Sequence, residues 1–370
     1  MTLTCTHWLR RCRSTEKPST PSGRLSASAP LREFENSLDV VGYNYVGRWR
    51  NRAETFYDED RKLFPNRRFC GSENPSVGGE RGVYPEASPW GSYAAATLNH
   101  EALWRYIVSH DFVAGDFLWT GIDYLGETRW PKKGAACGPI DTAGFEKDSF
   151  YYFRSLWNQK ETTLHLTPHW NWPGQEGQFK QVVCYTNCKE VALYLNGRLV
   201  GRKGYVCPRY GAEKNWYELN GRYATTNDLH LTWDVPYEPG ELKAVGFKDG
   251  QEVAVCSVAT TGDAAALKAK AWKTQLSVSG ILQIEVDAAD TENRVVPFAD
   301  NMVYCEIEGP AHLLGMDNGD LSDLTLCGLP KRKLFSGRLL TSLVADGPGT
   351  VTVTFTSEGL KTAQIELQIM

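Results

Sequence analysis

Two short parts of this 370-residue chain carry side chains suited to chemistry on sugars. Glu73 stands where a predicted buried strand gives way to small residues, so its carboxylate enters a loop. The apolar segment 117–127 contains Trp119, and two acids, Asp123 and Glu127, follow at its carboxyl end. A carboxylate can attack a glycosidic carbon, and an indole ring offers a flat apolar face to a sugar. We therefore expect a carbohydrate-active site.

The elements around these residues alternate between strand and helix, as in an α/β barrel. In residues 36–160, short apolar segments with polar groups at their ends are separated by helical patterns. Ser88 and Pro89 supply an N-cap and a first-turn proline for one helix. Because the chemistry of such barrels lies at the carboxyl ends of the strands, we predict three barrel-type β/α units here. The predicted strands are 38–45, 67–73 and 114–124, and the predicted helices are 90–110 and 148–157.

After residue 160 the pattern changes to alternation of apolar and polar residues with frequent turns, which is typical of antiparallel strands. Asn196 and Gly197, between two such strands, predict a type I′ hairpin. Strands at this spacing without helices indicate an immunoglobulin-like β-sandwich over residues 161–262 and a second one over 263–370. The predicted strands are 181–186, 190–195, 242–247, 276–278, 282–287, 303–308 and 350–356. The whole chain is thus predicted to be a multidomain α/β plus all-β protein.

Composition narrows the classes of function. A net charge of −4 and a pI near 6.0 argue against a nucleic-acid partner. No apolar run of about 18 residues predicts a membrane span. Ten cysteines are scattered, and the pair Cys184 and Cys188 has no second pair, so we expect no metal and no cofactor. Residues 1–35 lack the apolar segment of a secretory signal and are predicted to be a disordered tail, with a transit peptide as the alternative. Localisation stays open.

A series of short segments in residues 36–370 carries a family resemblance. They are 39–45, 65–73, 117–127, 141–148, 165–170, 185–188, 195–197 and 316–320. In this order they resemble the C-terminal part of glycoside hydrolase family 2, in particular its bacterial β-galactosidases with additional C-terminal sandwiches. The resemblance implies the last three β/α units of a TIM barrel followed by the two sandwiches.

The resemblance also implies roles for single residues. It makes Glu73 the nucleophile of a retaining mechanism and places Tyr45 where its phenol could donate a hydrogen bond to that carboxylate. It implies that Trp119 lies beneath the sugar ring and that Asp123 and Glu127 bind hydroxyl groups. Packing in the barrel core is the competing interpretation for the two aromatic residues, and a solvent-facing position is the competing one for Glu127.

The family's acid/base glutamate belongs to a motif that this sequence does not contain. We therefore expect a β-galactosidase fragment that hydrolyses terminal β-galactosides only when it associates with the remaining N-terminal part. A homo-oligomer is the other expected assembly. Two alternatives remain open. One is a non-catalytic carbohydrate-binding or interaction module, and the other is a family-2 enzyme of different specificity, such as a β-glucuronidase or β-mannosidase.

Overall fold

The structure, a computed structural model, describes most of the chain from residue 38 onward. The described residues are 38–44, 55–74, 77–84, 100–101, 103–104, 107, 110–128, 130–205, 229–273 and 275–370. Tyr45, residues 1–35, Ser88 and Pro89 lie outside these ranges. The chain divides into two compact units. The parallel-sheet unit holds the described residues up to 77 and from 100 to 119, and the sandwich unit holds residues 78–84 and those from 120 onward.

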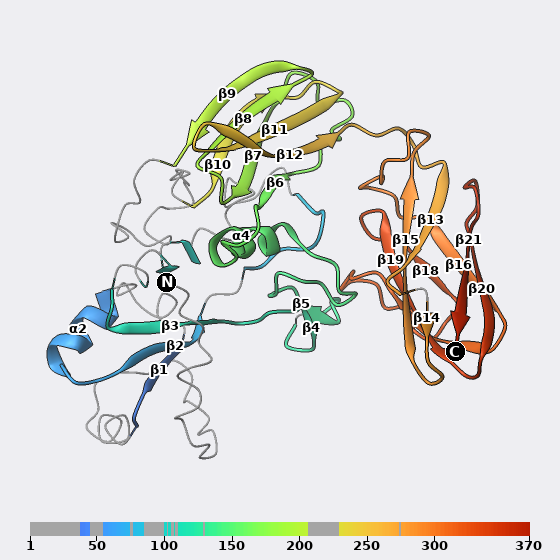
Figure 1. The fold of residues 1–370 in the computed structure, drawn as a ribbon, viewed down its shortest axis with the longest axis horizontal. Helices are drawn as coiled ribbons and strands as arrows, with labels where there is room; N and C mark the ends of the chain where they lie inside the picture. The colour runs from blue at the N-terminus through green and yellow to red at the C-terminus, as the bar shows by residue number, and fades with distance from the viewer. Residues whose placement is uncertain are drawn as a thin grey trace. The chain divides into compact units, whose positions relative to one another are not determined.

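The parallel-sheet unit contains three neighbouring parallel strands in the order β1-β2-β3 (Figure 1). Their bounds are Val41–Asn44 for β1, Phe69–Asn74 for β2 and Val113–Leu118 for β3, and helix α2, Thr55–Leu63, connects β1 to β2. Parallel strands need such crossover connections. The three parallel strands are present, whereas their membership of a partial TIM barrel remains a prediction.

A small apolar core covers one face of this sheet. Tyr43, Tyr57 and Phe69 are buried and their rings contact one another, with centroid distances of 5.1–6.1 Å. Leu103 and Ile107 join the same core and are helical, as are the described residues 100, 101 and 104. This is the described part of the predicted helix 90–110. The hydroxyl of Tyr43 also donates to Asp60 on α2 at 2.7 Å, which fixes the helix against β1.

The predicted strand 114–124 is wrong in its second half. Strand β3 ends at Leu118, and a separate short strand, β4 (Tyr124–Leu125), pairs antiparallel with β5 (Gly134–Ala135). Between the two, Ile122 forms a bridge to Ile140, and the Asp123 amide donates to the Ile140 carbonyl at 2.8 Å. The apolar sequence is continuous, but its hydrogen-bond partner changes after β3, so the strand does not continue.

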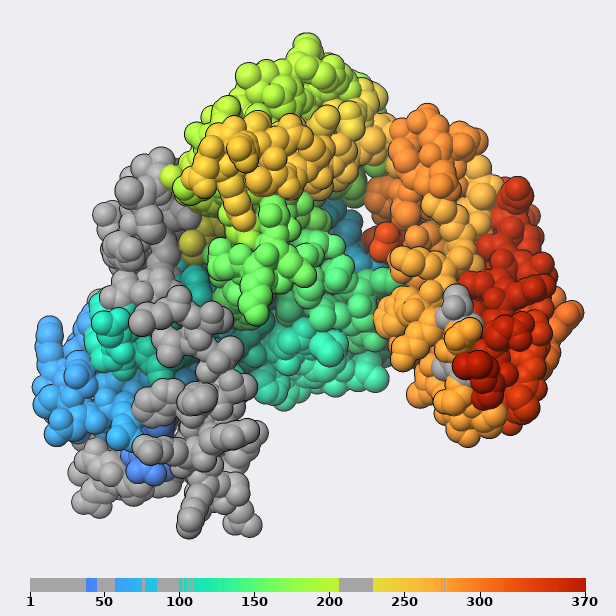
Figure 2. All heavy atoms as spheres, in the orientation of Figure 1, coloured from blue at the N-terminus to red at the C-terminus, as the bar shows by residue number. Residues whose placement is uncertain are grey.

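The first sandwich is built from two sheets, with orders β10-β7-β6 and β12-β11-β8-β9. The bounds are Leu164–Thr167 for β6, Phe179–Thr186 for β7, Glu190–Leu195 for β8, Arg198–Gly204 for β9, Leu231–Pro236 for β10, Glu241–Lys248 for β11 and Gln251–Ala259 for β12. Strand β6 contacts β11 and β12 across the two sheets. In Figure 2 the light green β8 and β9 and the gold β11 and β12 form one continuous surface. Helix α4, Asp148–Trp157, packs on β6 and β7 and matches the predicted helix.

The second sandwich contains sheets in the orders β13-β15-β19-β17 and β14-β21-β20-β16-β18. The bounds are Ala266–Ala271 for β13, Gln275–Leu276 for β14, Ile281–Ala289 for β15, Met302–Glu308 for β16, Ala311–Asp317 for β17, Lys331–Lys333 for β18, Arg338–Ala345 for β19, Gly349–Thr356 for β20 and Ala363–Ile369 for β21. One core contains buried side chains from both sheets, such as Ile284 and Leu343 from one and Val353 and Phe355 from the other.

The hairpin predicted at Asn196 and Gly197 is confirmed. Leu195 pairs with Arg198, and the two turn residues have φ of 50° and 78°, as a type I′ turn requires. The structure thus contains mainly β-strands arranged as two sandwiches, and their immunoglobulin-like topology remains a prediction. Within the described ranges, no helix has both the length and the apolar character to cross a membrane.

Candidate functional site

Glu73 lies at the carboxyl end of β2, the central strand of the parallel sheet. It is partly buried and is registered with Asn44 at the end of β1. The register of β2 shifts on both sides of Gly71, where a Cβ atom would collide with the side chains of Asn74 and Asp116. A glycine two residues before Glu73 therefore lets two polar side chains pack over the strand.

The Asn74 side chain connects β2 to β3. It is fully buried, and its amide donates a short hydrogen bond to Asp116 Oδ1. Asp116 Oδ2 is buried and has no hydrogen-bond partner among the described residues. Burial raises the pKa of Asp116 to about 7, against hydrogen bonds from Asn74 and from the Phe117 backbone. Below about pH 7 a neutral carboxyl group is thus favoured beside the strand that carries Glu73.

Asp116 was not predicted as a site residue from the sequence. The available signal is a single acid inside the otherwise apolar and small-residue strand Val113–Leu118. An acid in such a strand either faces solvent or is buried with a partner. Only the register, which places Asp116 opposite Gly71, shows which of the two applies.

Trp119 directly follows β3 and is partly buried. Its backbone amide donates to the Asn74 carbonyl at 3.3 Å. The residue after Glu73 is therefore bonded to Trp119, so the carboxyl ends of β2 and β3 meet. The backbone brings together the two residues for which the sequence predicts the nucleophile and the sugar platform.

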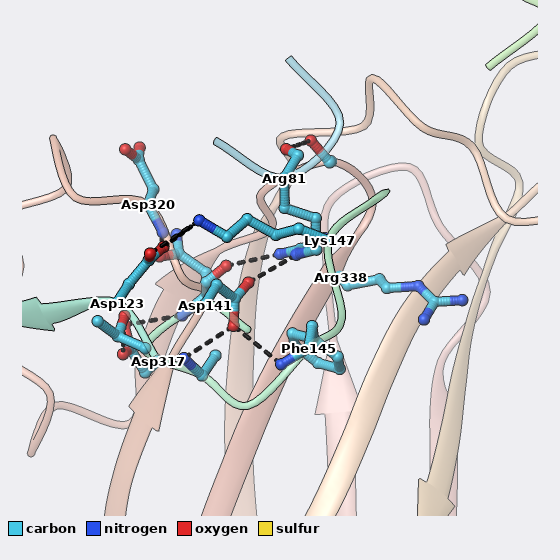
Figure 3. A network of polar contacts seen from close by, with 12 residues as sticks. Arg81, Asp123, Asp141, Phe145, Lys147, Asp317, Asp320 and Arg338 are labelled. Atoms are coloured by element: carbon cyan, nitrogen blue, oxygen red, sulfur yellow. Dashed lines mark hydrogen bonds and ion pairs between the residues drawn. The ribbon is translucent and has the colours of Figure 1, made fainter. Parts of the chain in front are cut away.

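Asp123, in the sandwich unit, lies in a buried ion pair. The Lys147 ammonium donates to both of its oxygens, at 2.7 and 2.8 Å, and the Gly138 amide donates to Oδ1 at 2.8 Å (Figure 3). Burial raises the pKa of Asp123 even though the charge of Lys147 opposes the shift. Since both oxygens already accept hydrogen bonds, this geometry favours Asp123 as an anchor of the chain. Its contact with a sugar hydroxyl stays a prediction.

Glu127 is exposed at the end of β4, with a φ of 47°. It accepts a hydrogen bond of 2.7 Å from the Tyr124 hydroxyl. Because the side chain is exposed, either a sugar hydroxyl or water can reach its carboxylate. Tyr45, the fifth predicted site residue, lies outside the described residues. Among the described residues, no group of three or more His, Cys, Asp and Glu side chains is arranged to hold a metal ion.

Comparisons with known proteins identify related families. Residues 266–366 match the family described as "Glycoside hydrolase family 2 C-terminal domain 5", and residues 177–254 match a domain of unknown function, DUF4982. Over 361 residues the chain is 31% identical to the β-galactosidase BoGH2A of Bacteroides ovatus, covering 89% of this chain and 39% of that protein. It is 28% identical over 239 residues to a β-glucuronidase of Formosa agariphila, covering 63% of this chain and 22% of that protein.

A solved structure shows the same fold. The crystal structure of a β-glycosidase from Bacteroides vulgatus superimposes with a TM-score of 0.75 at 24% identity, covering 93% of this chain and 49% of that one. The chain spans only 39% of the length of its Bacteroides ovatus relative. The similarity therefore extends over nearly all of this chain and over less than half of each of these larger proteins.

Proposed function

We propose that this chain, which belongs to glycoside hydrolase family 2, supplies the nucleophile of a retaining β-galactosidase. The observation that carries the proposal is the position of Glu73 at the carboxyl end of the central parallel strand, with Trp119 bonded to the next residue. Carboxyl ends of parallel strands are where α/β barrels place their catalytic groups. The β-galactosidase specificity is taken from the Bacteroides ovatus relative, which covers 89% of this chain.

In the proposed reaction, the Glu73 carboxylate attacks the anomeric carbon and forms a covalent glycosyl-enzyme ester. A second carboxyl group, about 5–5.5 Å away, protonates the departing oxygen. The same group then removes a proton from water, which attacks the anomeric carbon, releases the sugar and regenerates the Glu73 carboxylate. We assign this acid/base role to a polypeptide segment outside these 370 residues, because the family's acid/base motif does not occur in them.

The other predicted site residues bind the sugar or position the chain in this proposal. Trp119 provides the apolar platform under the sugar ring. For Tyr45, which lies outside the described residues, the role stays the one that the family resemblance implies. Glu127 binds a hydroxyl group through its exposed carboxylate. Asp123 acts mainly by holding the chain that leaves β3, since Lys147 and Gly138 already donate to its oxygens.

The test is hydrolysis of an aryl β-galactoside by the chain alone and by the chain mixed with the separately produced N-terminal part of the Bacteroides ovatus relative. We expect activity in the mixture only, because positioned acid catalysis contributes about 10²–10⁴-fold and orientation contributes further. Glu73→Gln should abolish it, whereas Glu358→Gln, at an exposed turn of the last sandwich, should not.

Several results would contradict or refine this proposal. Activity of the chain alone that Glu73→Gln removes would show that an acid/base is present in this chain. Hydrolysis of an aryl β-glucuronide in place of the galactoside would support the specificity of the Formosa agariphila relative. Binding of galactosides without hydrolysis in any mixture would favour the carbohydrate-binding module.

A further inference from the structure

We propose that Arg81 is a positioning residue through which the second sandwich holds the segment that follows Glu73. The segment comprises residues 78–84, named here the post-nucleophile loop, and its first residue comes five positions after Glu73 in the sequence. The inference rests on the proposed function of Glu73. It adds a role in catalysis for the C-terminal family domain, residues 266–366, which contains the partners of Arg81 on the second sandwich.

The buried Arg81 side chain donates two charge-assisted hydrogen bonds. Its Nε donates to Asp141 Oδ2 at 2.7 Å, and its Nη2 donates to the Asn318 carbonyl at 2.7 Å (Figure 3). The side chain is only 9% exposed, and its guanidinium lies 4.8 Å from the ring centre of Phe145. Planar guanidinium groups are suited to such fixed, multiple contacts. One side chain thus joins the loop, the segment before α4 and the second sandwich.

The backbone of the same loop is also bonded to the second sandwich. The Ser336 hydroxyl donates to the Arg81 carbonyl at 2.9 Å. Gly82 has a φ of 68°, and a Cβ atom there would lie 2.5 Å from Ser336 Oγ. A residue with a side chain would be strained at this φ and would push Ser336 away. Both the side chain and the backbone of Arg81 therefore form hydrogen bonds with the second sandwich.

The Lys147 ammonium adds a second anchor inside the sandwich unit. It donates to the Gly79 carbonyl at 2.8 Å as well as to Asp123. Gly79 comes six residues after Glu73, and Asp123 comes four residues after Trp119. One cation therefore holds the two segments that leave β2 and β3, the strands whose ends carry the proposed nucleophile and sugar platform.

Stability alone is a weak explanation for the buried ion pair between Arg81 and Asp141. Replacing buried ion pairs by apolar residues is often neutral or stabilising, so a buried pair is weak evidence for a stabilising role. Holding a unique geometry is the role that we infer for the pair, and catalysis is sensitive to geometry, since a displacement of about 1 Å can cost about 10²-fold in rate. The segments held by Arg81 and Lys147 are the ones that follow the proposed site residues.

The test compares Arg81→Met, Arg81→Lys and the control Arg294→Met. Arg294 pairs with the buried Asp290 at 2.7 Å in the same sandwich, and its other partner is Glu292, so the control removes an arginine from another buried carboxylate. Hydrogen exchange in the full chain reports on the amides of residues 77–84. Kinetics in the mixture with the N-terminal part of the Bacteroides ovatus relative report kcat and KM.

We expect Arg81→Met to speed exchange in residues 77–84 by about 10-fold or more and to lower kcat by about 10²-fold with KM little changed. Arg81→Lys should retain part of the exchange protection and part of kcat. Arg294→Met should change neither the exchange of residues 77–84 nor kcat. Unchanged exchange and kcat in Arg81→Met, or equal losses in Arg294→Met, would overturn the proposal. If the wild-type mixture is inactive, the proposed function fails, and the exchange data alone decide whether Arg81 holds the loop.

Discussion

The second sandwich and the parallel sheet bury their residues in different ways. In the sandwich, β15 alternates buried and less buried residues along its length, and one core joins both of its sheets. In the parallel sheet, β1, β2 and β3 carry irregular registers, and the described core covers one face. The sandwich therefore has one apolar core shared by its own strands, whereas the described part of the sheet that carries Glu73 has a smaller one.

The parallel sheet also contains buried polar side chains beside Glu73. Next to Glu73 the fully buried Asn74 side chain bonds to Asp116, whose other oxygen is buried without a described partner. Buried polar groups of this kind reduce stability unless they are fully satisfied. The described region around Glu73 therefore contains a buried polar group that is not fully satisfied, and Arg81 bonds the segment after it to the second sandwich.

The largest effect is expected when the sandwiches are separated from the rest of the chain, which tests whether they fold independently. Residues 161–370 expressed alone should give a soluble, β-rich protein with a cooperative thermal transition, since these strands bury their own cores. The transition should lie below that of the full chain, because Tyr152 of α4 no longer covers Tyr185. A disordered product would show that the sandwiches depend on the preceding residues.

Matched phenylalanine substitutions compare the two cores directly. Phe69 in β2 and Phe355 in β20 are both fully buried, so replacing either by alanine should cost about 3–5 kcal/mol in its own region. We expect Phe355→Ala to lower the sandwich transition while the sandwich still folds. Phe69→Ala should abolish hydrogen-exchange protection of β1 to β3. Retained protection in Phe69→Ala would mean that the parallel sheet is more stable than its core suggests.

The pH dependence of the parallel sheet should reveal Asp116. Its pKa is raised to about 7 in the folded protein, whereas an unfolded aspartate titrates near pH 4. The neutral form therefore stabilises the folded state below about pH 4, and this contribution is lost as the pH rises toward about 7.

Asp116→Asn should reduce this loss of stability with rising pH, because an amide stays neutral. The measurement is exchange protection of β2 and β3 across this pH range. The exposed Asp234→Asn in β10 serves as the control and should keep the wild-type slope. A slope that persists in Asp116→Asn would assign it to other groups.

The smallest effect is expected in the first sandwich, at the tip of the β8–β9 hairpin. Asn196 has a φ of 50° and its side-chain oxygen accepts from the Glu241 amide at 2.9 Å. Asn196→Ala should lower stability by about 1–2 kcal/mol, from both the backbone conformation and the lost hydrogen bond. Asn196→Gly, which keeps the conformation, should lose less. Chemical denaturation of residues 161–370 measures both, and equal losses would mean that the conformation contributes little.

Local patterns predicted much of the sandwich half and of α4. Alternation and turn residues are local properties, so the strands and the Asn196-Gly197 hairpin could be read from the sequence. The predicted strand 114–124 was wrong in its second half because Ile122 pairs with Ile140, outside the segment that the local pattern describes. For the same reason the Asp123–Lys147 pair and the burial of Asp116 were not predicted. Each depends on residues that only the fold brings together.

The central claim is that Glu73 is the nucleophile. A 2-deoxy-2-fluoro-β-galactoside with a dinitrophenolate leaving group tests it most directly. This leaving group departs without protonation, and the fluorine slows hydrolysis of the ester, so the covalent intermediate accumulates. We predict one sugar adduct, located by peptide mass spectrometry on Glu73, in the mixture with the N-terminal part of the Bacteroides ovatus relative. The Glu73→Gln chain should give none. An adduct on another residue of this chain, or an adduct that persists in Glu73→Gln, would contradict the claim.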